Sequence, residues 1–291
     1  MLSIHDSYIK IMRLLSNDSS TDHLDIYKFS KNFTLFDNHF RPKGIDLKLK
    51  EKDIPLFPVP FGSTGENPKL VMLGINPGLS PESVAEEKEI AGNTYFSYAD
   101  AYSNGTIIRF SSMEQKSKYY THKVFPIALS LKYGEHIKYG EYKDVHQENS
   151  FNELIKDFNL MTIECIPYYS KKFEKTGNAS EILSQDFYRQ YADILFESLE
   201  SNIEDNGTFF ILYTPRQFQD PGHMASLYYN RYFEKLENVF SEEKFLIGCL
   251  KIKSKNIMLV VCKYGEQSGI NKAEDKERFW QTVYEYRQKN L

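Results

Sequence analysis

The segment GINPGLS, residues 74–80, presents an asparagine inside a turn built from proline and glycine. It follows directly on LVMLGI, residues 70–75, an apolar run typical of a buried strand. Pro77 and Gly78 prevent the strand from continuing, so the amide of Asn76 is held in a rigid frame at the strand end. A rigid amide is suited to holding one small molecule in one orientation. Asn76 is therefore the first candidate functional residue, although a plain N-P-G turn explains the same letters.

A second candidate group lies in YTPRQFQDPGH, residues 213–223, after another apolar run. Arg216 offers a guanidinium that can hold a phosphate, and His223 offers a hydrogen-bond donor. A turn with a surface arginine and a helix cap accounts for this stretch equally well, so both interpretations stay open.

Several classes of site have no support in the sequence. It contains neither a G-x-G-x-x-G nor a G-x-x-x-x-G-K-[ST] phosphate loop, and its histidines do not show the spacing of metal ligands. The three cysteines, Cys165, Cys249 and Cys262, include no C-x-x-C pair and are expected to be small buried hydrophobes. We expect no metal and no cofactor.

The composition indicates a folded protein of the cytosol. The chain has 291 residues and a formal net charge of -4, which neither supports nor excludes a nucleic-acid partner. It contains no apolar run of the roughly 18 to 20 residues that a membrane span requires, and its N-terminus lacks the layout of a signal peptide. We expect a cytoplasmic monomer that does not enter a membrane.

The elements that must position these candidates alternate along the chain. Short apolar runs predict buried strands at 70–75, 160–166, 208–213, 245–252 and 256–261. Apolar residues at helical spacing predict helices at 4–15, 183–203 and 224–240 and a closing helix around 279–284. Function is then expected at the carboxyl ends of the strands.

Strands that alternate with helices predict an α/β fold, a three-layer α/β/α sandwich around a mostly parallel central sheet. The irregular stretch before the first core strand predicts an N-terminal helical and irregular extension, residues 1–67, packed on the core. The α/β domain itself is expected to span residues 68–291 and to include the C-terminal helix.

The letters GINPGLS at the end of a core strand resemble the first motif of the uracil-DNA glycosylase superfamily, most closely that of the mismatch-specific thymine/uracil glycosylases. The resemblance in organisation covers about residues 68–269. It implies the three-layer fold of that family and a pocket that receives a base swung out of the nucleic-acid stack.

The resemblance also implies roles for individual residues. Asn76 would orient the attacking water as the catalytic residue, while Gly74, Ile75, Pro77 and Gly78 would line the base pocket. An amide is not a strong general base, so catalysis would depend on positioning and on a dissociative transition state. The flipped base would stack on an aromatic side chain of GNTYFSYADAY, residues 92–102, with Phe96 preferred and Tyr95 second; ordinary core aromatics explain the same letters.

Glu164 in TIECIPYYS stands where several branches of the family carry a base-reading residue, often asparagine. A carboxylate would repel a departing uracil anion, so Glu164 must be protonated, point away, or bind a base that offers donors. Purines and cytosine offer such donors. A glutamate turned to solvent, or paired with Lys171 or Lys172, is the alternative.

The second family motif is missing. Relatives carry Asn-Pro-Ser or His-Pro-Ser after the last strand. This chain has KYGEQSGINK there, in which only Ser268 and the glycine after it partly match the motif. The donor to the leaving base is therefore absent from its usual place, and His223 is a candidate to replace it.

We therefore expect a uracil-DNA-glycosylase-like protein that recognises a flipped or single-stranded base in DNA or a nucleotide. If the site is complete, it would be an N-glycosylase, a hydrolase of base-excision repair. The alternatives are a non-catalytic nucleotide or modified-base binding protein, and an enzyme acting on a small nucleoside without DNA contact.

Overall fold

The computed structural model describes residues 3–16, 61–63, 65–74, 95–104, 123–137, 159–165, 186–265 and 269–291. These residues form one seven-stranded sheet with the strand order β1-β3-β2-β4-β7-β6-β5. In chain order the strands are β1 (Phe61–Ser63), β2 (Leu70–Gly74), β3 (Leu160–Glu164), β4 (Thr208–Ile211), β5 (Leu236–Ser241), β6 (Phe245–Ile252) and β7 (Lys255–Cys262). The helices are α1 (Ile4–Ser16), α5 (Tyr95–Ser103), α7 (Phe125–Tyr133), α11 (Asp186–Asn202), α12 (Pro215–Gln219), α13 (Ser226–Tyr232), the 3-10 turn η6 (Phe233–Lys235) and α14 (Ala273–Asn290).

The sheet is mixed. Strands β3, β2, β4 and β7 pair in parallel and form its centre. Both margins are antiparallel, because β1 pairs antiparallel with β3, and β6 lies antiparallel between β7 and β5. The predicted α/β class is confirmed, while the expectation of a mostly parallel sheet holds for the centre and not for the margins.

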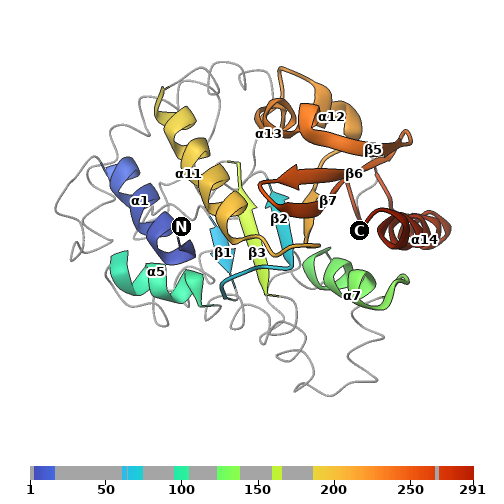
Figure 1. Ribbon diagram of the computed structural model, residues 1–291, viewed down its shortest axis with the longest axis horizontal. Helices are drawn as coiled ribbons and strands as arrows, with labels where there is room; N and C mark the ends of the chain where they lie inside the picture. The colour runs from blue at the N-terminus through green and yellow to red at the C-terminus, as the bar shows by residue number, and fades with distance from the viewer. Residues whose placement is uncertain are drawn as a thin grey trace, which may run out of the picture.

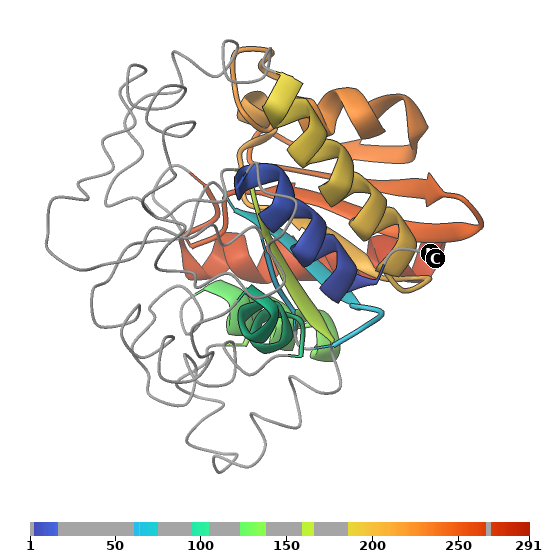
Figure 2. The ribbon, with the colours of Figure 1, turned by 90° about the vertical axis from the view of Figure 1, so that its left-hand side faces the viewer.

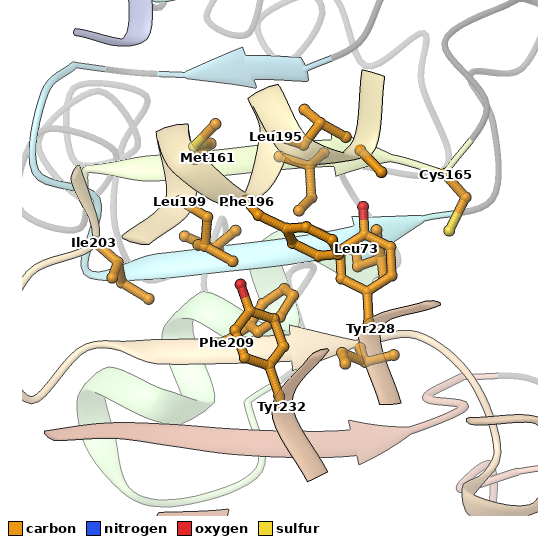
Figure 3. Packing of buried hydrophobic residues seen from close by; sticks show 14 of the residues in the cluster. Leu73, Met161, Cys165, Leu195, Phe196, Leu199, Ile203, Phe209, Tyr228 and Tyr232 are labelled. Atoms are coloured by element: carbon orange, nitrogen blue, oxygen red, sulfur yellow. The ribbon is translucent and has the colours of Figure 1, made fainter. Parts of the chain in front are cut away.

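Helices cover both faces of this sheet (Figures 1 and 2). Side chains alternate along the central strands, so that Val71 and Leu73 of β2 pack under one helix layer and Leu70 and Met72 under the other. The first layer contains α1, α5, α11 and α13, and the second contains α7 and α14. Figure 3 shows the first layer, with Leu195, Phe196 and Leu199 of α11 over the sheet.

The part of the chain expected as an N-terminal extension supplies two elements to this core. Helix α1 places Ile4, Tyr8, Ile11 and Met12 in the first layer, where it lies beside α11 (Figure 2). Strand β1 adds an antiparallel edge to β3.

The prediction of a helix over residues 224–240 is wrong in its second half. Helix α13 ends at Tyr232, and Leu236–Ser241 form β5, an edge strand that pairs with β6. The helical spacing was misleading because almost all of β5 is exposed, so its side chains show no inside–outside alternation. A register shift at Asn238, which has a φ of 52°, bends this edge strand.

The second layer contains the one tryptophan of the sequence. Trp280 of α14 is buried, and its indole Nε1 donates a hydrogen bond of 3.0 Å to the hydroxyl of Tyr264. The Tyr264 hydroxyl also lies 3.1 Å from Nδ1 of His136, which follows α7. This chain of polar contacts joins α14, the end of β7 and the segment after α7.

Within the described residues, none of the helices combines the length and the apolar character needed to cross a membrane. All three cysteines are buried and free, as predicted.

Candidate functional site

The carboxyl ends of the four parallel strands lie at one edge of the sheet, where ligands of such sheets bind. At this edge Gly74, the last residue of β2, stands beside Glu164, the last residue of β3. The two predicted base-binding residues that the structure describes on these strands are therefore neighbours in register.

The carboxyl group of Glu164 lies directly on the backbone of Gly74. A Cβ atom at position 74 would come within 2.6 Å of Glu164 Oε2 and 3.2 Å of Oε1, distances that a real side chain does not tolerate. Any other residue at this position would have to displace the carboxyl, which occupies the space of its Cβ atom. Glu164 is not turned to solvent, since the residue is only 9% exposed. Lys171 and Lys172, its alternative partners, lie outside the described residues.

This environment keeps Glu164 neutral. Burial raises the pKa of its carboxyl from 4.5 to about 8, because the charged form loses its water and gains no compensating charge. In the described part of the chain, no residue hydrogen-bonds to the buried Oε2 atom. At pH 7 the site therefore holds a carboxylic acid, with one O–H donor and one acceptor oxygen.

Three tyrosines, Tyr188, Tyr191 and Tyr213, contact the ends of β2 and β3 from the layer that contains α11. Tyr191 donates its hydroxyl to the backbone oxygen of Glu164 at 2.7 Å, and Tyr188 donates to that of Cys165 at 2.7 Å. The Tyr213 hydroxyl lies 3.5 Å from both the Gly74 oxygen and the Cys165 sulfur. These buried bonds fix the backbone beneath the carboxyl, so that the acid is presented from a rigid base.

The hydrogen bonds of these three tyrosines were not predicted from the sequence. The sequence pattern placed Tyr191 on the apolar face of a helix and Tyr213 at a strand end, with no role for the hydroxyls. A tyrosine in place of phenylalanine on a buried face is the available signal, because its hydroxyl needs a partner there.

His223 is buried against Tyr213, with the two rings edge to face and their centroids 4.7 Å apart. The backbone N–H of Ala225 donates to His223 Nδ1 at 3.2 Å, which places the proton of the neutral ring on Nε2. Burial lowers the pKa of His223, and the positive charge of Lys263 at the end of β7 lowers it further, against the opposing effect of Asp220. His223 is thus a neutral imidazole whose Nε2 is a donor.

Arg216 has a different environment. It is exposed on α12, whose start is closed by a capping box between Thr214 and Gln217. No hydrogen bond or ion pair joins Arg216 to another described residue. The predicted helix cap and the predicted surface arginine are both present, and phosphate binding by Arg216 stays a prediction.

The segment after β7 is the place where the second family motif is expected. Hydrogen bonds between its own backbone groups close it into a turn. Ile270 donates to the oxygen of Lys263 at 3.0 Å, and Gly265 donates to the oxygen of Ile270 at 2.8 Å. Gly269 lies so close to Lys263 that an added Cβ would be 1.8 Å from its backbone oxygen. Ser268 lies outside the described residues.

Other predicted residues also lie outside the description. Asn76, Ile75, Pro77 and Gly78 follow β2 in a segment that is not described. Tyr95 and Phe96 open α5, which packs against α1 and β1, but their side chains are not described. Among the described residues, no group of three histidine, cysteine, aspartate or glutamate side chains is arranged to hold a metal ion.

The comparison with known proteins gives no further assignment: no protein-family model matches the chain, and no curated protein matches it in sequence.

Replacing the glycine under the carboxyl should change the titration of Glu164. In Gly74→Ala the new methyl displaces the carboxyl toward water, so we expect the pKa of Glu164 to fall from about 8 toward 4.5. The expected change is at least about one pH unit, or ~1.4 kcal/mol. Carbon-13 NMR of labelled glutamate measures it directly.

Gly248→Ala is the matched control, because Gly248 also lies in a strand but a Cβ there would meet the methyl group of Leu236 at 3.0 Å. This control should leave the Glu164 midpoint unchanged. A midpoint that stays near pH 8 in Gly74→Ala would contradict the role assigned to the glycine.

Proposed function

We propose that this chain is a uracil-DNA-glycosylase-like protein that receives a flipped or single-stranded base at the carboxyl edge of its sheet. The observation that carries the proposal is the buried, neutral carboxyl of Glu164 on Gly74, the glycine that opens the GINPGLS segment. In this proposal Asn76, two residues further along, orients the attacking water. The helices on both faces of the sheet support the proposal at the level of the α/β class.

The neutral state of Glu164 removes an objection to base excision. An ionised carboxylate would repel the base as it departs with the bonding electron pair, whereas a carboxylic acid can donate a hydrogen bond to it. In the proposed hydrolysis the bond between C1′ and the base nitrogen breaks, the water oxygen joins C1′, and the water proton passes to the base or to solvent. Asn76 contributes orientation, because its amide is not basic enough to take that proton.

A second donor is also available from the chain. His223 is held neutral with its proton on Nε2, and it packs on Tyr213, which reaches the oxygen of Gly74. We propose that His223 stabilises the leaving base in place of the missing second motif, and that Arg216 contacts a phosphate.

The non-catalytic alternative rests on the segment after β7. That segment is closed by its own backbone hydrogen bonds around Gly269 and contains neither the asparagine nor the histidine of the family motif. A protein that kept the pocket and lost this donor would bind a modified base or nucleotide without cleaving it.

An excision assay tests the proposal. Single- and double-stranded oligonucleotides with uracil, hypoxanthine, xanthine or a thymine mismatch are incubated with the native protein and with Asn76→Ala. We expect abasic sites from the native protein and a rate about 100-fold lower from the variant, because the water is no longer positioned.

Asn230→Ala is the control, since Asn230 is exposed on α13 and should retain full activity. Salt-sensitive binding without abasic sites would favour the non-catalytic alternative. Neither cleavage nor binding by the folded native protein would contradict the proposed function.

A further inference from the structure

Glu164 carries a buried polar atom at the carboxyl edge of the sheet. Its Oε2 atom has no hydrogen-bond partner among the described residues, although the residue is more than nine-tenths buried. Buried polar groups are nearly always paired, and an exception at the ligand-binding edge of a sheet indicates a partner that arrives from outside.

The backbone that carries this group is held in place. The carboxyl lies on Gly74 with no room for a side chain beneath it, and the backbone of the same residue is tied to Tyr191. An unpaired group on a backbone held in this way is prepared to recognise a complementary hydrogen-bonding edge.

We propose that Glu164, as a carboxylic acid, reads a ring edge that offers a hydrogen-bond acceptor next to an N–H donor, and that ionisation of this carboxyl releases the ligand. This inference rests on the proposed function and specifies both the chemical class of the base and the control of its binding.

The chemistry of the two states differs sharply. A carboxylic acid donates through its O–H and accepts through its carbonyl oxygen, so it pairs with a C=O next to N–H, as in uracil and on one part of guanine, or with a ring nitrogen next to an amino group, as in adenine. A carboxylate only accepts and requires two adjacent donors, as guanine provides. Protonation of one residue therefore decides which edge is bound.

The described groups around Glu164 do not titrate in the same range. Among the described residues, Cys165 on the same strand end and Tyr213 after β4 interact electrostatically with Glu164. Burial raises the pKa of Cys165 to about 12 and that of Tyr213 well above 10, and it also raises the pKa of Tyr188 on α11. Tyr191 of α11 contacts the backbone oxygen of Glu164, and β2 contributes no titratable side chain beside it.

The remaining charged groups near this edge act further away. His223 packs on Tyr213, and Lys263 acts on His223. The pKa of His223 is lowered, so this ring is neutral throughout the range in which Glu164 loses its proton.

The experiment is calorimetric titration of uracil, adenine and guanine as free bases, which contain no bond to hydrolyse, between pH 6 and pH 9.5. The native protein, Glu164→Gln, Glu164→Ala and Glu277→Gln are compared, and circular dichroism verifies that each is folded. Glutamine keeps one donor and one acceptor but cannot ionise in this range, and Glu277 is an exposed control on α14.

For the native protein and Glu277→Gln, we expect affinity for uracil or adenine to be constant up to pH 7 and to fall about tenfold per pH unit above the midpoint near pH 8. Glu164→Gln should bind within a few-fold of the native protein at pH 7 and keep its affinity for adenine up to pH 9.5. Glu164→Ala should lose binding. A decrease caused by ionisation of uracil itself would also occur in Glu164→Gln, which separates the two effects.

Binding to the native protein that does not change up to pH 9.5, or guanine affinity that rises with pH while the other bases do not bind, would overturn the inference and leave the proposed function standing. Loss of binding in a folded Glu164→Gln variant would do the same. Failure of the native protein to bind any base at any pH would overturn the proposed function and this inference with it.

Discussion

Glu164→Gln should make the protein more resistant to alkaline conditions. The pKa of Glu164 is about 8 in the folded protein and 4.5 when the side chain is solvated, so between these values the folded chain retains a proton that the unfolded chain has lost. The free energy of unfolding therefore falls as the pH rises, by about 1.4 kcal/mol per unit, or roughly 5 kcal/mol in total. The stabilising contribution of neutral Glu164 is complete below pH 4.5 and exhausted above pH 8.

Urea denaturation of the native protein and Glu164→Gln at pH 5, 6, 7, 8, 9 and 9.5 measures this effect. The difference between the two proteins should increase by about 1.4 kcal/mol per pH unit in favour of the variant and then level off. This slope is independent of any constant cost of burying an amide. Glu277→Gln should follow the native protein, and parallel curves for Glu164→Gln would contradict the assignment of a neutral buried acid.

The second large effect is expected from Gly269→Ala. The new Cβ would lie 1.8 Å from the backbone oxygen of Lys263 and 2.7 Å from its carbonyl carbon, so the backbone itself must move. That movement breaks the hydrogen bond from Ile270 to Lys263 and disturbs Tyr264 and Ile270, which are buried in the second layer. We expect a loss of on the order of 3 kcal/mol in the free energy of unfolding.

Gly222→Ala is the comparison for this variant, because a Cβ at Gly222 would meet only the carboxylate of Asp220, at 3.3 Å. Its stability should change by less than about 0.5 kcal/mol. If Gly269→Ala were as stable as Gly222→Ala in denaturant, the closed geometry after β7 would be wrong.

The central strands could be predicted from sequence because they are buried on both faces and read as continuous apolar runs. Leu70–Gly74 and Leu160–Glu164 lie within one or two residues of the predicted bounds. Strand β5 could not be predicted, because an exposed edge strand with a register shift carries neither an apolar run nor an alternating pattern.

The protonation state of Glu164 could not be predicted from the sequence. The residue was identified as a candidate, but three interpretations stayed open: protonated, turned away, or bound to donors. Its neutral state depends on the parallel register that places Gly74 beside Glu164, and register is a property of two strands far apart in the chain. The predicted role of Asn76 remains a prediction for the excision assay.

The position of Trp280 gives one side of the sheet a fluorescent probe of its own. As the sole indole in the chain, it emits only from the layer under α14, where its N–H is bound to Tyr264. The opposite layer contains buried tyrosines, among them Tyr188, Tyr191, Tyr228 and Tyr232, but no tryptophan. Red-shifted emission with little loss of far-ultraviolet dichroism would thus identify a molecule in which α14 has detached from the sheet while the secondary structure remains intact.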